Sequence, residues 1–78
     1  MFVRAVFDGD LMARLIPVDE ADSLAVVART VADQAIGVTV PPRDRPIGVW
    51  HNDNLLDQQN TVRSAGITPM DVVRVAYV

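Results

Sequence analysis

The sequence predicts an α+β domain in which a mixed β-sheet of four to five strands carries one main helix on one face. The chain has 78 residues, half of them hydrophobic, which is enough for one packed core. Near its start, two runs of β-branched and aromatic residues flank an Asp-Gly turn, and an apolar stripe at helical spacing follows. The last run is nearly all apolar, as expected for a strand with neighbours on both sides.

The first two strands are expected to form an antiparallel hairpin. The runs are Phe2–Phe7 and Leu11–Val18, joined by Asp8-Gly9-Asp10, whose Asp-Gly step suits a tight turn. Period-two alternation assigns six residues to the core side: Val3, Ala5, Phe7, Leu11, Ala13 and Leu15. The opposite, solvent-facing side is then expected to carry a mixed set: Phe2, Arg4, Val6, Met12, Arg14 and Ile16.

A helix is predicted after the acidic segment 19–22. Ser23 is the expected N-cap, with Asp22 as the alternative, because either side-chain oxygen can accept from a free N–H of the first turn. Apolar residues then recur at helical spacing and predict one buried stripe: Leu24, Val27, Ala28, Val31 and Ala35. Gly37 is expected to end the helix in the left-handed conformation.

The second half of the chain supplies three further strands. Three prolines exclude regular structure between Val40 and Pro46. Ile47–His51 is a predicted strand, Asn52-Asp53-Asn54 a turn, and Leu55-Leu56 a very short fourth strand.

One short helical turn is expected over Thr61–Ala65, ended by Gly66. Pro69-Met70-Asp71 then turns the chain into the last strand, Val72–Val78. The order β-β-α-β-β-β, with a long central last strand, is that of a β-grasp fold in a single domain over residues 1–78.

Composition and charge exclude several classes of function. The net charge is −3, and the basic residues are scattered among ten acids, which argues against a nucleic-acid partner. No apolar run approaches the roughly 18 residues of a membrane span, and no signal peptide opens the chain, so we expect a cytoplasmic protein. The chain stops at Tyr77-Val78 without a Gly-Gly tail, which argues against a covalent modifier.

The basic residues are all arginines: Arg4, Arg14, Arg29, Arg43, Arg45, Arg63 and Arg74. Arginine without lysine suits pairing across an interface, because the guanidinium fork is easily desolvated. A GC-rich genome accounts for the same bias, and composition alone leaves both interpretations open.

We expect no catalytic, cofactor or metal site in this chain. His51 is the only histidine and there is no cysteine, so a triad, a zinc site and a thiol nucleophile all lack partners. We interpret His51 as a surface residue at a strand end. Asn52-Asp53-Asn54 with Asp57 hints at a calcium loop, but the required Gly and bidentate Glu are missing, so a polar turn is the better interpretation.

The candidate partner interface is the sheet face opposite the helix. It comprises five residues: Phe2, Met12, Arg14, Ile16 and Trp50. Contiguous apolar groups on one side of a sheet tend to mark interaction sites. Trp50 has two interpretations that stay open here, a core side chain or a surface anchor of the kind enriched at binding hot spots.

The chain resembles ubiquitin along nearly its whole length. The resemblance lies in Asp22-Ser23 before the helix, in Gly37 followed by Val40-Pro41-Pro42, and in the segment Thr61–Ile67. It is still more similar to the ubiquitin-like gamma subunits (system protein B type) of bacterial multicomponent diiron monooxygenases, the toluene, alkene and isoprene group. That similarity covers the hairpin leading to Val18-Asp19, then Pro42-Arg43, and the segment Ala65–Val73.

The second resemblance implies a non-catalytic subunit of a monooxygenase. It implies that the chain docks on a large alpha subunit, which holds the diiron centre, within a dimer of alpha-beta-gamma trimers. No iron-ligand motif of an alpha subunit is present here. The segment from Pro41 to Asn54 departs from the family pattern, so contacts there cannot be carried over. The alternative hypothesis is a ubiquitin-like module of another bacterial assembly, such as a secretion-system accessory protein.

Overall fold

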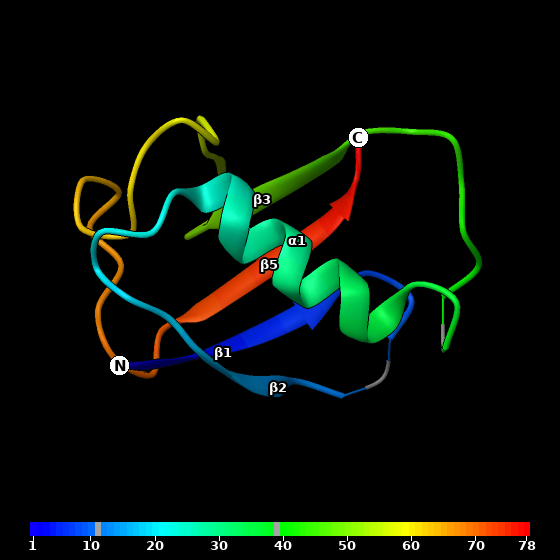
Figure 1. Ribbon diagram of the computed structural model, residues 1–78, viewed down its shortest axis with the longest axis horizontal. Helices are drawn as coiled ribbons and strands as arrows, with labels where there is room; N and C mark the ends of the chain where they lie inside the picture. The colour runs from blue at the N-terminus through cyan, green and yellow to red at the C-terminus, as the bar shows by residue number, and fades with distance from the viewer. Residues whose placement is uncertain (11, 39) are drawn as a thin grey trace.

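In the computed structural model, which describes residues 1–10, 12–38 and 40–78, five strands form one mixed sheet and one helix crosses it (Figure 1). The elements are β1 (Phe2–Phe7), β2 (Arg14–Pro17), α1 (Leu24–Ala35), β3 (Ile47–His51), β4 (Asn54–Leu55) and β5 (Val72–Tyr77). The strand order is β2-β1-β5-β3-β4, with β1 and β5 parallel and the other neighbours antiparallel. The predicted β-grasp architecture, with the last strand in the centre, is therefore confirmed.

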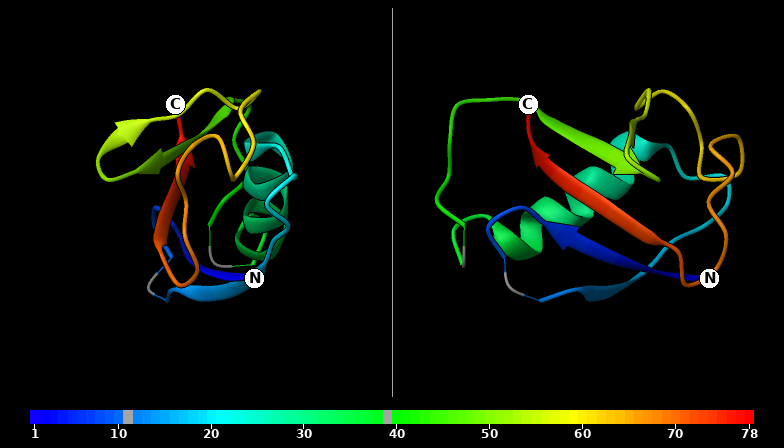
Figure 2. Two further views of the ribbon diagram at one scale, coloured as in Figure 1. Left: turned by 90° about the vertical axis from the view of Figure 1, so that its left-hand side faces the viewer. Right: turned by 180° about the vertical axis from the view of Figure 1, so that it is seen from behind.

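The hydrophobic core lies between α1 and one face of the sheet. Side views show α1 on that face and no described helix or strand over the other (Figure 2). The predicted helical stripe is confirmed, since all five of its residues are buried. The largest fully buried side chains on the sheet side are Phe7, Val3 and Ile16 from the hairpin and Val49, Val73 and Val75 from the centre.

Both ends of α1 form as the sequence predicts. Ser23 is the N-cap, and its Oγ accepts a hydrogen bond of 3.3 Å from the Val26 N–H. At the other end, the Ile36 N–H donates to the Ala32 carbonyl at 2.8 Å. Gly37 follows with φ +82°, the left-handed conformation that glycine adopts at no steric cost.

The register of the first hairpin differs from the prediction by one residue. Val3 lies opposite Ile16 rather than Leu15, so Ile16 is fully buried and Leu15 is 58% exposed. A slip of one residue exchanges the two faces of a strand, and the predicted inward side of the second strand is therefore wrong. Ala13 is also exposed, and Leu11 lies outside the described residues.

The cause lies in the connection, because β2 begins only at Arg14 and the described residues before it, 8–10 and 12–13, belong to neither strand. Asp10 organises this longer loop. Its carboxylate accepts from the Met12 N–H at 3.3 Å and from the Arg14 guanidinium at 2.9 Å. An aspartate side chain that accepts from the backbone N–H two residues later forms a local turn. The Asp-Gly step alone does not predict this additional turn.

Three smaller differences concern the second half of the chain. The β3–β4 hairpin turns on two residues, Asn52 and Asp53, both with positive φ, so β4 begins one residue before the predicted strand and ends at Leu55. Segment 61–66 contains one i→i+4 hydrogen bond, from the Ala65 N–H to the Thr61 carbonyl, but no helix element. The final strand ends at Tyr77 rather than Val78. The prediction of irregular structure from Val40 to Pro46 is confirmed for residues 41–46, whereas Val40 forms an isolated β-bridge with Ile36.

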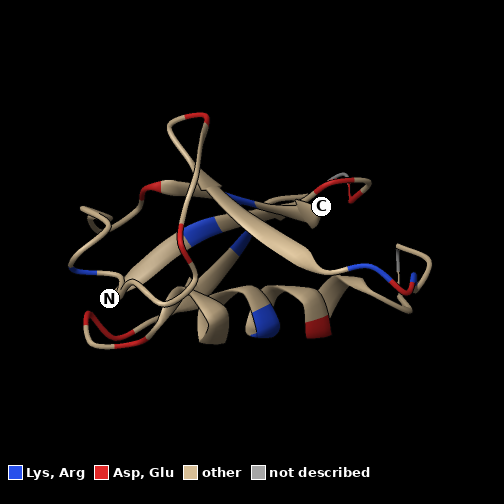
Figure 3. Ribbon diagram, turned by 90° about the horizontal axis from the view of Figure 1, so that it is seen from above, with Lys and Arg blue, Asp and Glu red and all other residues tan. Residues whose placement is uncertain are grey.

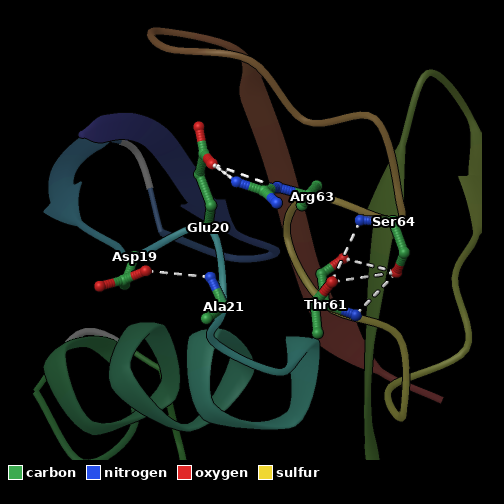
Figure 4. A network of polar contacts seen from close by, with 6 residues as sticks. All are labelled: Asp19, Glu20, Ala21, Thr61, Arg63 and Ser64. Carbon is green, nitrogen blue, oxygen red and sulfur yellow. Dashed lines mark hydrogen bonds and ion pairs between the residues drawn. The ribbon is translucent and has the colours of Figure 1, made fainter.

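The segment before α1 is fastened to segment 61–66. The Arg63 guanidinium donates to Glu20 at 2.6 Å, and the Thr61 and Ser64 hydroxyls and N–H groups bind one another (Figure 4). The hydrogen bond to Glu20 raises the pKa of Arg63 above its ordinary value. Backbone bonds from the Arg63 N–H to the Glu20 carbonyl and from the Val62 N–H to the Asp22 carbonyl join the same two segments. These contacts fix where α1 enters the fold.

Candidate protein interface

The sheet face opposite α1 carries two rows of side chains that mix apolar groups with arginine. Register places Leu15, Arg4 and Val72 side by side across β2, β1 and β5. The next row crosses β1, β5, β3 and β4 and consists of Val6, Arg74, Trp50 and Leu55. We call these seven residues, together with Phe2, the open-face patch.

The patch exposes more apolar surface than isolated surface residues would. Its exposed members are Phe2 (53%), Leu15 (58%), Leu55 (58%) and Val72 (50%), while Val6 and Trp50 are half-buried. Large apolar side chains are ordinary on a protein surface when they are scattered. Here they share one face of one sheet, an arrangement that is typical of interaction sites.

Trp50 lies on the open face and not in the core. Its ring stacks against the Arg74 guanidinium, with 4.4 Å from the Arg74 Cζ to the ring centroid. Arg74 also pairs with Asp8 at 2.9 Å, so the guanidinium is held from a second side. Glycine at 48 makes room for the tryptophan, since a Cβ there would lie 3.0 Å from the Trp50 Cη2. Trp50 is therefore half-buried on the sheet surface and is not part of the buried core, while its role as an anchor for a partner stays a prediction.

The second arginine of the patch is held by the backbone. The Arg4 Nε donates to the Met70 carbonyl at 3.0 Å. Met70 adopts φ +67° and its N–H donates to the Phe2 carbonyl at 2.7 Å, so the turn before β5 closes against the start of β1. Both arginines are thereby positioned between apolar neighbours, with guanidinium edges available to a partner.

The structure corrects the sequence-predicted membership of this interface. Ile16 is fully buried in the core and Arg14 faces the same side as Ala5, where it pairs with Asp10, so placing these two residues on the open face was wrong. The one-residue register shift is the physical reason. Met12 is exposed in the loop before β2 and is not a sheet residue.

Phe2 and Trp50 are on the open face as predicted. Sequence reasoning missed Leu15, Leu55 and Val72. The register error assigned Leu15 to the core. Val72 and Leu55 are on the sheet face opposite to that of their neighbours Val73 and Asn54, as period-two alternation predicts. Both could have been found from strand pairing.

His51 ends β3 as predicted, but the expectation of a surface histidine was wrong, because its side chain is only 11% exposed. Its Nε2 lies 3.0 Å from the Asp71 Oδ2. The same carboxylate accepts from the Thr68 N–H at 2.9 Å, and this backbone bond, more than His51, lowers the pKa of Asp71 below its ordinary value. The pair joins the end of β3 to the start of β5.

Two properties of the described residues bear on other classes of site. No three His, Cys, Asp or Glu side chains in ranges 1–10, 12–38 and 40–78 are grouped so that they could hold a metal ion. Nor does any helix in those ranges have the length and apolar character needed to cross a membrane.

Fold and surface together define a ubiquitin-like β-grasp domain that presents an apolar, arginine-containing sheet face. An archaeal ubiquitin from Caldiarchaeum subterraneum aligns with a TM-score of 0.77 at 15% identity, covering 100% of this chain and 92% of that one. At this identity the likeness concerns the fold alone.

The profile of the family described as toluene-4-monooxygenase system protein B (TmoB) matches residues 1–77, and this chain belongs to that family. The gamma subunit of the hydroxylase component of a toluene-4-monooxygenase system from Ectopseudomonas mendocina is 30% identical over 77 residues, which is 96% of this chain and 92% of that protein. A chain in the solved toluene 4 monooxygenase HD complex with the inhibitor 4-bromobenzoate aligns with a TM-score of 0.92 at 29% identity. That alignment covers 99% of this chain and 96% of that one.

Proposed function

We propose that this chain is the gamma subunit of the hydroxylase component of a soluble diiron monooxygenase that oxidises aromatic or alkene hydrocarbons. The observation that carries the proposal is the end-to-end match, in sequence and in backbone, to a chain found in a hydroxylase complex. The proposed assembly is a cytoplasmic dimer of alpha-beta-gamma trimers, in which the diiron centre belongs to the alpha subunit.

The proposed role is structural, without catalysis or a cofactor in this chain. Among the described titratable groups, the closest to a catalytic pair is His51 with Asp71, and that pair holds two strand ends together. The guanidinium groups of the open face contact Asp8, Trp50 and a backbone carbonyl. These contacts are typical of a recognition surface.

We propose the open-face patch as the surface that docks on the alpha subunit, with Phe2 and Trp50 retained from the sequence prediction and Met12 at its margin. Burying a Leu or Val side chain fully contributes about 1.5–3 kcal/mol, so four half-exposed apolar residues supply a sizeable part of a stable interface. Trp50, stacked on Arg74, has the composition of an interaction hot spot.

Two valines that are almost equally exposed offer a matched test. Val72 on the open face is 50% exposed and Val26 on α1 is 51% exposed. The tagged chain and each variant are co-expressed with the alpha and beta subunits, and the recovered complex is quantified. Val72→Asp should weaken assembly at least about 30-fold, since a carboxylate left unpaired at an interface costs roughly 2 kcal/mol or more. Val26→Asp should assemble normally.

Urea unfolding of both variants serves as the control for folding. Equal assembly by the two variants would contradict the docking surface. Failure of the unmodified chain to recover either large subunit would contradict the proposed function itself.

A further inference from the structure

A groove on the helix side of the molecule gathers the arginines that the rest of the fold leaves unused. It lies between α1 and segment 41–46 and has a volume of about 420 Å³. Arg29 of α1 lines this groove together with Arg43 and Arg45 of the segment. We call it the arginine groove. Seen from above, basic and acidic residues of the segment lie at the end of the molecule where α1 finishes (Figure 3).

The charge balance of the groove is unlike that of the whole chain. The guanidinium groups of four of the seven arginines have hydrogen-bond or ion-pair partners elsewhere: Arg4, Arg14, Arg63 and Arg74. Within the described ranges, the guanidinium groups of Arg29, Arg43 and Arg45 make no hydrogen bond or ion pair. Asp33 is the acid among the lining residues, so three cations face one anion in a protein whose net charge is −3.

Segment 41–46 has no regular structure, yet both of its ends are hydrogen-bonded to the end of the chain, one to Tyr77 of β5 and the other to Val78. The Tyr77 hydroxyl donates to the Pro41 carbonyl at 3.2 Å and accepts from the Arg43 N–H at 3.1 Å. At the other end, the Val78 N–H donates to the Pro46 carbonyl at 2.8 Å. Three prolines restrict the backbone further. The two arginines are thus carried by a fixed loop, which lowers the entropy lost on binding.

Tyr77, whose hydroxyl binds the segment, packs against the hydrophobic core. The Tyr77 ring meets Phe7 edge to face, with 5.5 Å between centroids and an interplanar angle of 80°. Phe7 is 2% exposed. Core packing therefore holds Tyr77, and Tyr77 holds the loop that presents the guanidinium groups.

We propose that the arginine groove binds an extended acidic segment of a protein partner. Guanidinium forks match carboxylates in bidentate geometry, and three unpaired forks on two sides of one groove suit several acidic side chains in a row. Ile36 and Ile47 also line the groove and provide apolar contact for the stems of those side chains. The groove's volume accommodates a stretch of peptide rather than one ion. The site is separate from the open-face patch, and its test is independent of the hydroxylase.

A short labelled glutamate peptide, with the matched glutamine peptide as its control, is the probe. It is titrated into the full chain under low salt while backbone amide shifts and fluorescence polarisation are recorded. The glutamate peptide should bind saturably, shift the amides of Arg43, Arg45 and Ile36, and weaken as salt rises. The glutamine peptide should not bind.

Two variants and one control locate the binding. The double change Arg43→Gln with Arg45→Gln should reduce affinity at least about tenfold, while Arg63→Gln, a paired arginine outside the groove, should leave it unchanged. Tyr77→Phe removes the hydroxyl that holds the loop and should weaken binding without removing any charge. Thermal unfolding of each variant separates lost binding from lost folding.

Three results would overturn the proposal. They are absence of saturable peptide binding, equal losses for Arg63→Gln and for the groove variant, and tighter binding of inorganic phosphate than of the peptide in the same groove. Co-purification with the hydroxylase subunits should survive the groove variant, so the two proposals fail separately.

Discussion

The register of the first hairpin makes the sharpest quantitative prediction, because adjacent residues have opposite environments. Ile16 of β2 is fully buried in the core, whereas Leu15 is 58% exposed on the open face. Ile16→Ala should lower the free energy of unfolding by about 2–3 kcal/mol, the lower part of the range for such truncations, since an edge strand can partly close the cavity. Leu15→Ala should change it by about 0.5 kcal/mol or less.

The size of this effect is large for so small a domain. At roughly 0.05–0.15 kcal/mol per residue, the 78-residue chain has a total stability of about 4–12 kcal/mol. A loss of about 2–3 kcal/mol corresponds to a fall in Tm of roughly 10–20 °C.

Urea unfolding followed by Trp50 fluorescence measures both variants, because unfolding separates the indole from Arg74. The slope with urea should stay constant, which attributes the change to stability. If Leu15→Ala proved more destabilising than Ile16→Ala, the observed register would be refuted in favour of the one that the sequence pattern suggests.

Three further changes test other contacts of the fold. Ser23→Ala removes the N-cap acceptor and should cost about 1 kcal/mol in urea unfolding, whereas no measurable cost would contradict the cap. Gly37→Ala should cost roughly 1–2 kcal/mol through its φ of +82° alone, because nothing lies within 4 Å of the added Cβ; a stabilising effect would oppose this. The hydrogen bond from the Thr68 N–H lowers the pKa of Asp71 below its ordinary 3.8. The Asp71 carboxylate therefore contributes its full stabilisation above pH 3.8. The contribution is lost as the pH falls through the lower pKa of the folded state. Asp71→Asn should flatten this acid-side loss in unfolding scans at stepped pH, and an unchanged profile would show that Asp71 is not its source.

Much of the fold follows from local signals that agree with one another. The stripe from Leu24 to Ala35, the cap at Ser23 and the stop at Gly37 all specify the same helix, and tertiary structure leaves that helix unchanged. The apolar run at Val72 predicts a central strand because only a strand with two neighbours and a covered face buries such a sequence.

The errors arose where a side chain reorganised a turn. The carboxylate of Asp10 binds Met12 and Arg14, lengthens the loop, and moves Ile16 from the solvent face to the core. Since alternation has period two, one extra residue reversed the assignment of the whole second strand and carried Arg14 and Ile16 out of the predicted interface.

The arginine groove could not be predicted from local sequence patterns, for a different reason. Arg29 and Arg43 are 14 residues apart in the sequence, and the hydroxyl that fixes the loop between them comes from Tyr77, near the other end of the chain. Only the folded sheet brings these groups together. The bias toward arginine is visible in the sequence. The sequence does not show which guanidinium groups remain unpaired in the folded protein.

The most direct test of the central claim is affinity purification of the tagged chain from its own host, followed by native mass spectrometry and iron analysis. We expect recovery of an assembly with two larger subunits and with iron that stays with the largest subunit when the assembly is dissociated. Recovery of the chain alone, or only with partners that contain no iron, would contradict it.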